Sequence, residues 1–185
     1  MTHEAIFSGF GGQGVLTMGM ILGYAAIFEG KEVTWMPSYG PEMRGGTANC
    51  ITIISDEMIS SPIISKFDTV VALNQPSIDK FERAVKPGGN LLYDTSTTLR
   101  HPTRSDINIY YLPAGEIAVE LKNTKVLNMI MLGAFLKITN VVSIESIWKG
   151  LAAMLPERYH KLIPLNQEAF MRGYNTINYK EPVKA

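Results

Sequence analysis

The sequence predicts an α/β protein: a single doubly wound, Rossmann-like domain with a mainly parallel sheet and a helical C-terminal section. Three observations support this fold class. Short apolar runs rich in β-branched residues alternate with longer runs of helical length, as in an open sheet covered by helices. A glycine-rich turn separates the first strand pattern from the first helix pattern. From Pro113 onward the apolar spacing is helical.

The chain opens with a predicted strand, a glycine loop, a helix and a second strand. Residues 5–10 are a short apolar run, residues 15–28 are apolar on all sides and end before Gly30, and residues 32–36 return to a strand pattern. Two strands joined through a helix are expected to run parallel, with a right-handed crossover.

The later elements follow from caps and turns. Asn74 is a predicted helix N-cap with Pro76 in the first turn, and Ser143 is a second predicted cap. We expect strands at 47–55, 69–73, 90–94 and 109–112, a turn at 87–89, loops at 37–46 and 95–106, and helices at 115–122, 126–138 and 144–154. The domain is expected to span residues 1–174, with residues 175–185 as an arm or disordered tail.

Composition excludes several classes of function. The 17 basic and 17 acidic residues balance, so the chain has no basic field for nucleic acid. No signal peptide or membrane span is visible, which predicts a cytoplasmic protein without membrane contact. The single cysteine, Cys50, and three scattered histidines cannot hold an iron–sulfur cluster or a structural zinc. Cys50 lies in a strand pattern and is expected to be buried and inert.

The glycine loop is the first candidate binding site. Gly9, Gly11 and Gly14 match G-x-G-x-x-G between a strand and a helix. Glycines allow an anion to approach closely, and a helix N-terminus offers free N–H groups. The loop could therefore bind a phosphate or pyrophosphate, or the glycines could only permit close packing of helix on strand. An NAD site is disfavoured because residues 35–38, which end the second strand, include no acidic residue to hold a ribose.

A second loop follows the second strand and should lie at the same edge of the sheet. It holds Tyr39, Glu42 and Arg44 among glycines and a proline. Arg44 suits a phosphate or a partner's carboxylate, whereas Glu42 and Arg44 could also form an ordinary local ion pair. Asn128 is the strongly polar residue of an apolar helix, where it is either a donor facing a ligand or a satisfied buried amide.

The two loops together resemble a known family. Residues 9–15 (GFGGQGV) and 38–47 (SYGPEMRGGT) closely resemble the two signature stretches of the 2-oxoacid:ferredoxin oxidoreductase gamma family. Residues 54–56 (ISD), residues 86–89 (KPGG) and Asn128, followed by Leu-Gly-Ala at 132–134, agree with it. The resemblance covers roughly residues 4 to 172. The wording of the motifs is more similar to the 2-oxoglutarate or branched-chain 2-oxoacid enzymes than to the pyruvate enzymes.

The resemblance implies a multi-subunit enzyme. Such complexes oxidatively decarboxylate a 2-oxoacid, here expected to be 2-oxoglutarate, on thiamine diphosphate, pass electrons through iron–sulfur clusters to ferredoxin, and release an acyl-CoA. Thiamine diphosphate and the clusters are implied on alpha, beta and delta-type partner chains, and coenzyme A at or near this chain. The chain would thus be a subunit that is catalytically incomplete alone, and a homodimer of the isolated chain stays open.

The resemblance also assigns site residues. The implied phosphate cradle consists of Gly9, Gly11, Gly12, Gln13 and Gly14. The residues implied near coenzyme A or a partner's cofactor at the same edge are Tyr39, Glu42 and Arg44, and Asn128 is a further candidate. No catalytic or metal-binding residue is assigned. The alternatives are a stand-alone nucleotide-binding dehydrogenase and a non-catalytic scaffold subunit.

Overall fold

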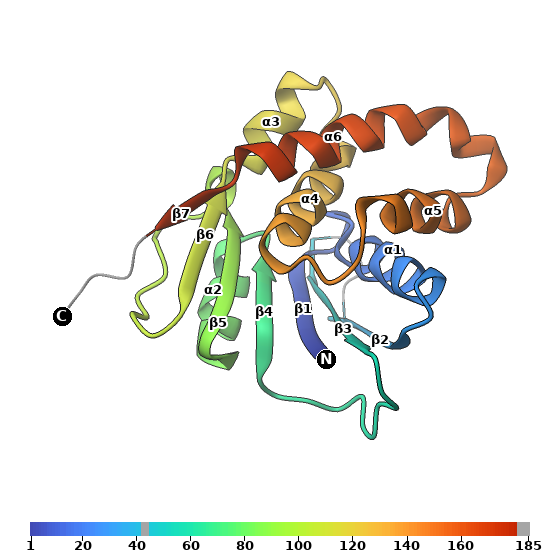
Figure 1. Ribbon diagram of the computed structural model, residues 1–185. Coiled ribbons are helices and arrows are strands. Elements are labelled where there is room, and N and C mark those ends of the chain that lie inside the picture. The colour runs from blue at the N-terminus through green and yellow to red at the C-terminus, as the bar shows by residue number, and fades with distance from the viewer. Residues whose placement is uncertain (42–44, 181–185) are drawn as a thin grey trace.

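A seven-stranded sheet forms the centre of the protein, in the order β2-β3-β1-β4-β5-β6-β7. The computed structural model describes residues 1–41 and 45–180. The strands are β1 (Thr2–Phe10), β2 (Glu32–Tyr39), β3 (Thr47–Ser55), β4 (Phe67–Ala72), β5 (Val85–Asp94), β6 (Asn108–Leu112) and β7 (Asn178–Lys180) (Figure 1). The α-helices are α1 (Val15–Phe28), α2 (Gln75–Phe81), α3 (Ala114–Glu120), α4 (Leu127–Thr139), α5 (Ile144–Met154) and α6 (Ile163–Thr176).

The predicted fold class is confirmed, but the opening unit is arranged differently from the prediction. β1, β4, β5 and β6 are parallel neighbours, whereas β3 lies antiparallel between β1 and β2. β1 and β2 therefore point the same way without pairing. β3 is mostly buried and β2 mostly exposed, so the more apolar strand takes the inner position. β2 is left as an edge strand, where Pro37 is tolerated because its missing N–H faces no obligatory partner; the strand continues to Tyr39, beyond the predicted end.

Two further boundaries differ from the prediction. Residues 87–89, expected as a turn, lie within β5, where the pairing with β4 shifts register between Phe67 and Thr69. Residues 175–180, expected as part of an arm or tail, complete α6 and form β7, which pairs antiparallel with β6. The rings of Tyr110 and Tyr179 meet across these strands with centroids 5.1 Å apart, a contact that stabilises the pairing. Residues 181–185 lie outside the described part.

The predicted helix caps are confirmed. The Asn74 side chain accepts the backbone N–H of Ser77 at 2.9 Å, and the Ser143 hydroxyl accepts that of Ser146 at 3.1 Å. Each cap satisfies one of the donors that a helix N-terminus leaves open. α1, α4 and α6, in contrast, begin without a side-chain cap.

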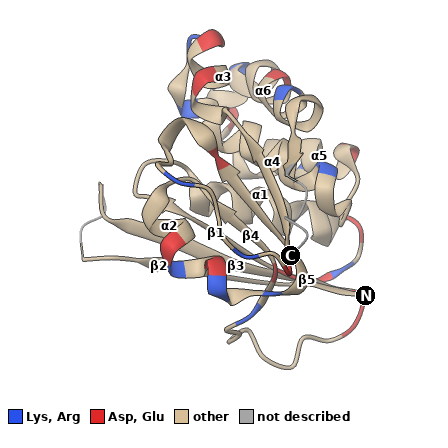
Figure 2. Ribbon diagram, turned by 90° about the vertical axis from the view of Figure 1, so that its left-hand side faces the viewer, with Lys and Arg blue, Asp and Glu red and all other residues tan. Residues whose placement is uncertain are grey.

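The sheet has a thick and a thin cover. One face, with Phe7, Val71 and Leu92, packs against α1, α3, α4, α5 and α6 in the larger core cluster. The other face, with Ile6, Val70 and Tyr93, belongs to a smaller cluster that includes Ile78 of α2. Helices thus cover both faces, as in a doubly wound domain. Figure 2 shows α1 without a charged residue along its length, as expected for a helix buried between the sheet and other helices.

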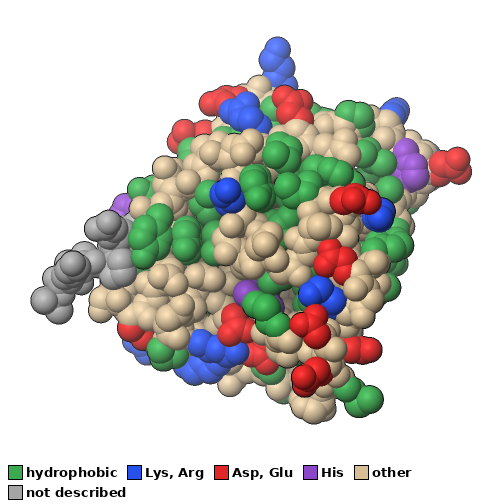
Figure 3. Space-filling view, viewed as in Figure 1, with side chains coloured by type: hydrophobic (Ala, Val, Ile, Leu, Met, Phe, Trp, Pro, Cys, Tyr) green, Lys and Arg blue, Asp and Glu red, His purple; other side chains and the backbone are tan. Residues whose placement is uncertain are grey.

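Two glycines let α4 and α6 cross closely. A Cβ on Gly133 would overlap the backbone carbonyl of Phe170, and one on Gly173 would overlap that of Ile130. Figure 3 shows apolar side chains gathered over the α4 and α6 side of the molecule, with charged side chains mostly around them. Among the described residues, no helix combines the length and the apolar character needed to cross a bilayer.

Candidate functional site

The candidate site lies where the connections after β1 and β4 diverge. The two strands are parallel neighbours, paired from Ala5 with Thr69 to Ser8 with Ala72. The chain after β1 enters α1 on one face of the sheet, and the chain after β4 enters α2 on the other. Such a switch point opens a crevice at the carboxyl ends of the strands, the usual ligand position in open α/β sheets. The glycine loop, residues 9–14, begins at the carboxyl end of β1 and so lies at this switch point.

Gln13 holds the glycine loop in shape. Its Oε1 accepts the backbone N–H of Phe10 at 2.6 Å, and its Nε2 donates to the Leu73 carbonyl at 3.4 Å, at the end of β4. The backbone N–H of Gln13 donates to the Phe10 carbonyl at 3.1 Å. The structure therefore places Gln13 as a brace between the loop and β4, with its side-chain amide already engaged within the protein.

The second loop lies against the first, as predicted. The N–H of Gly11 donates to the Gly46 carbonyl at 2.8 Å, and the N–H of Gly45 donates to the Gly11 carbonyl at 3.4 Å. The strand register explains the contact, because Tyr39 pairs with Ala48, which also pairs with Gly9. Tyr39 is half exposed at this edge. Glu42 and Arg44 lie outside the described residues.

The N-terminus of α1 is open toward this crevice. Gly14 is the N-cap residue, with φ of 77°, and neither a side-chain cap nor an acidic first-turn residue is present among the described residues. The N–H of Met18 is bonded to the Gly14 carbonyl at 3.1 Å, so the N–H groups of residues 15–17 precede the first intrahelical bond. Gly12 has φ of 99° and open space where a Cβ would stand. The arrangement leaves donors and a partial positive charge for an anion.

The first and last glycines of the motif, Gly9 and Gly14, are needed for packing. A Cβ on Gly9 would lie 2.6 Å from Gln13 Oε1 and 3.1 Å from both Leu73 Cβ and Val15 Cγ1. A Cβ on Gly14 would lie 2.8 Å from Asn128 Nδ2. The two interpretations of the loop therefore apply to different glycines. Gly9 and Gly14 permit close packing, whereas Gly12 borders open space that an anion could enter.

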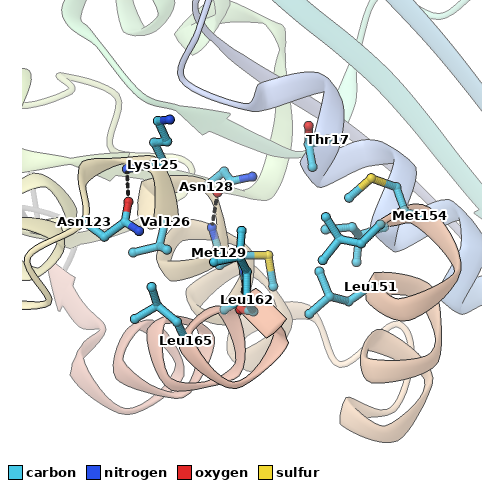
Figure 4. A pocket seen from close by; sticks show the side chains of 13 residues that line it. Thr17, Asn123, Lys125, Val126, Asn128, Met129, Leu151, Met154, Leu162 and Leu165 are labelled. Atoms are coloured by element: carbon cyan, nitrogen blue, oxygen red, sulfur yellow. Dashed lines mark hydrogen bonds between the residues drawn. The ribbon is translucent and has the colours of Figure 1, made fainter. Parts of the chain in front are cut away.

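Asn128 reaches the site from α4. It is 7% exposed, and its Oδ1 accepts the N–H of Met129 at 2.9 Å. Its Nδ2 group lies against Gly14 and has no acceptor among the described residues. Figure 4 shows this amide pointing along the cavity toward Thr17. The amide oxygen is therefore satisfied locally, while the amide nitrogen is directed into the site.

A cavity of about 200 Å³ continues from this amide between α1, α4, α5, the 3-10 segment Glu157–Leu162 and the start of α6. Most of its lining is apolar, with polar side chains from Thr17, Asn123, Lys125, Asn128 and Asn166 (Figure 4). The sequence interpretation missed Thr17 and Lys125. The available signals were a hydroxyl in the first turn of an otherwise apolar helix and a lysine three residues before Asn128.

The single cysteine, Cys50, lies in the buried core. Burial raises the pKa of the Cys50 thiol to about 12, and its Sγ donates to the Val15 carbonyl at 3.2 Å. The expectation of an inert buried thiol is confirmed. Within residues 1–41 and 45–180, no group of three or more His, Cys, Asp or Glu side chains is placed to hold a metal ion.

Comparison with known families decides the assignment. The family model for pyruvate ferredoxin/flavodoxin oxidoreductase matches residues 4–176, nearly the whole chain. The chain belongs to this family. It is a gamma-type member, a subunit of a 2-oxoacid:ferredoxin oxidoreductase, as the resemblance of the two loops implied.

Two curated relatives illustrate the range of the family. The 2-oxoglutarate synthase subunit KorC of Methanocaldococcus jannaschii is 40% identical over 178 residues, which cover 94% of this chain and 93% of KorC. The ketoisovalerate oxidoreductase subunit VorA of Methanothermobacter marburgensis is 45% identical over 129 residues. That match covers 70% of this chain but only 27% of VorA, so the chain corresponds to about a quarter of that relative.

Solved structures agree with the family and the fold. The gamma subunit of a keto/oxoacid ferredoxin oxidoreductase from Geobacter sulfurreducens superposes with a TM-score of 0.83 at 32% identity, covering 95% of this chain and 96% of that one. The 2-oxoglutarate:ferredoxin oxidoreductase of Magnetococcus marinus, a structure with 2-oxoglutarate, coenzyme A and succinyl-CoA bound, gives a TM-score of 0.86 at 23% identity. It contains this fold as 33% of a longer chain, and at that identity the likeness concerns the fold alone.

Proposed function

We propose that this subunit binds the pyrophosphate of coenzyme A at the N-terminus of α1, for a complex that converts a 2-oxoacid to an acyl-CoA. The observation that carries the proposal is the uncapped N-terminus of α1 behind Gly12, with the amide of Asn128 directed into the same site. A pyrophosphate needs N–H donors, a positive potential and close backbone approach, and the first turn of α1 together with Gly12 offers all three.

The chemistry would take place on partner chains. Under this proposal, alpha, beta and delta-type subunits hold thiamine diphosphate and the iron–sulfur clusters, which supply the decarboxylation and the electron transfer to ferredoxin. This chain presents coenzyme A to that centre. The glycine loop lies at the carboxyl edge of the sheet, where a partner chain can approach, and this position supports such a role.

The proposed substrate is 2-oxoglutarate, with a branched-chain 2-oxoacid as the alternative. The matches to KorC and VorA support this pair of acids. Anaerobic purification of the complex through a tag on this chain, with mass spectrometry of the partners, provides the material for the test. Coenzyme A-dependent reduction of ferredoxin should be fastest with 2-oxoglutarate among 2-oxoglutarate, 2-oxoisovalerate and pyruvate. Faster turnover of pyruvate would contradict this part of the proposal.

Amide hydrogen exchange of the same complex tests the binding site. Coenzyme A should slow exchange in peptides covering residues 9–18, because its phosphates engage the loop and first-turn N–H groups. Peptides covering residues 86–90, at the opposite edge of the sheet, should be unaffected and form the internal control. Protection confined to other chains would indicate a scaffold role for this subunit.

A further inference from the structure

The cavity beside the glycine loop is built to hold part of a ligand. Its wall includes Met129, Leu151 and Leu162, while polar groups come from Thr17 of α1 and, across the cavity, from Asn128 of α4 and Lys125 just before it (Figure 4). An apolar wall with a few directed polar groups is typical of small-molecule sites. Methionine side chains, which also line this cavity, adapt their shape to a flat aromatic ring.

The cavity borders the proposed phosphate site. Thr17 stands in the first turn of α1, and Asn128 contacts Gly14 while it also lines the cavity. A ligand whose phosphates rest on the N-terminus of α1 can therefore place an adjoining group in the cavity without leaving the surface of this chain.

The size of the cavity limits which group can enter. Its volume of about 200 Å³ is below the roughly 300–1,000 Å³ of sites that enclose whole drug-sized ligands. It exceeds the roughly 150 Å³ of an apolar cavity known to accept benzene. The cavity thus accommodates a single ring system and not an entire coenzyme.

The position of the reactive thiol determines which end of coenzyme A can enter the cavity. Its thiol must reach the reaction centre, which under the proposed function lies on another chain, so the thiol arm has to point away from this cavity. We propose that the cavity binds the adenosine end of coenzyme A, with the adenine ring against its apolar wall and the ribose 3′-phosphate near Lys125. This inference rests on the proposed function. Lys125 is exposed and has no carboxylate within ion-pair distance in the described part of the chain, so its charge is available to a phosphate.

The first test uses the 3′-phosphate. In the purified complex, dephospho-CoA should have a KM several-fold above that of coenzyme A, because it lacks the group that faces Lys125. Lys125→Met should raise the KM for coenzyme A by roughly fivefold and leave that for dephospho-CoA unchanged. Lys122→Met is the matched control, since it removes an equal charge from the same segment outside the cavity lining. Equal effects of the two substitutions would overturn the role of Lys125.

The second test fills the cavity. Leu162 is 38% exposed at its border, so Leu162→Trp can insert a ring without disturbing the buried core. It should raise the KM for coenzyme A about tenfold or more and leave the KM for pantetheine, which lacks the adenosine end, unchanged. Leu99→Trp, at a side chain that is 94% exposed and outside the cavity lining, is the control. An unchanged KM for coenzyme A in a folded Leu162→Trp complex would overturn the inference.

The two proposals can fail separately. If coenzyme A protects the amides of residues 9–18 but neither cavity variant changes its KM, the phosphate site stands and the adenosine site is wrong. If no protection occurs at the loop, the proposed function itself is wrong. Inhibition by adenosine 3′,5′-bisphosphate that competes with coenzyme A, and that weakens in Lys125→Met, would support the adenosine site independently of the thiol.

Discussion

The two ends of β1 show how one strand serves structure at one edge and ligand binding at the other. At the amino end, Lys86 Nζ lies 2.6 Å from Glu4 Oε2 and 2.7 Å from Asp68 Oδ1, and Asp68 also accepts the N–H of Glu4. At the carboxyl end, among the described residues, the loop and the first turn of α1 have no ion pair, and the N–H groups of residues 15–17 precede the first intrahelical bond. Charges that satisfy each other hold a fold together, whereas open donors mark the edge where a ligand completes the structure.

The largest loss of stability is expected at Gly14, which packs against Asn128 and also lies in the candidate site. Gly14→Ala should lower the free energy of unfolding by about 2–4 kcal/mol, because strain at positive φ adds to overlap with Asn128. Gly30→Ala, at the other end of α1, has nearly the same φ of 73° and open space, so it should cost only about 1 kcal/mol. Urea denaturation of both variants measures the difference. Equal losses would show that the contact with Asn128 contributes nothing.

Gly12→Asp tests whether coenzyme A binding depends on the carboxyl edge of the sheet and not on the amino edge. It brings negative charge and bulk to the proposed phosphate site and should raise the KM for coenzyme A at least about tenfold in the complex. Gly88→Asp is the matched control, since Gly88 has φ of 75° and open space but lies at the amino edge. The two variants should lose similar stability, and only Gly12→Asp should affect coenzyme A. A similar KM in both variants would remove the phosphate site from this loop.

Lys86→Met probes the amino edge alone. Although burial opposes the charge, hydrogen bonds to Asp68 and Glu4 raise the pKa of Lys86, so the ion pairs persist at neutral pH. Because Lys86 is partly exposed, the loss in unfolding free energy should be only about 0.5–1 kcal/mol, and smaller at high salt. The KM for coenzyme A should stay as in the wild type. An increase would show that the two edges are coupled.

The smallest effect concerns His3, which sits at the amino edge with Asp68, Lys86 and Glu4 around it. Burial and the nearby Lys86 lower its pKa from 6.5, against the opposite influence of Asp68 and Glu4. The folded protein therefore binds fewer protons than the unfolded chain, and stability should fall as the pH drops below about 6.5. The slope should be a fraction of the about 1.4 kcal/mol per pH unit for one full proton. Thermal melting of His3→Phe should show a flatter pH dependence, and an unchanged one would exclude His3 as its source.

Local sequence patterns were sufficient for most elements. α1, β3 and α5 begin and end at the predicted residues, and the caps Asn74 and Ser143 act as predicted. Apolar period, caps and glycines are local properties, so they determine where an element begins and ends. β7 was not predicted, because it depends on pairing with β6, which is distant in sequence.

The sequence by itself determined the α/β class, the glycine loop before α1 and the family to which the loops belong. Only the tertiary structure decided that β3 separates β1 from β2, that Gln13 braces the loop, and that Asn128 meets Gly14 across more than a hundred residues of sequence. The physical reason is that strand order and helix packing follow from the burial of whole faces. A side chain's position in a site built from distant elements is therefore a property of the packed core and not of its own segment.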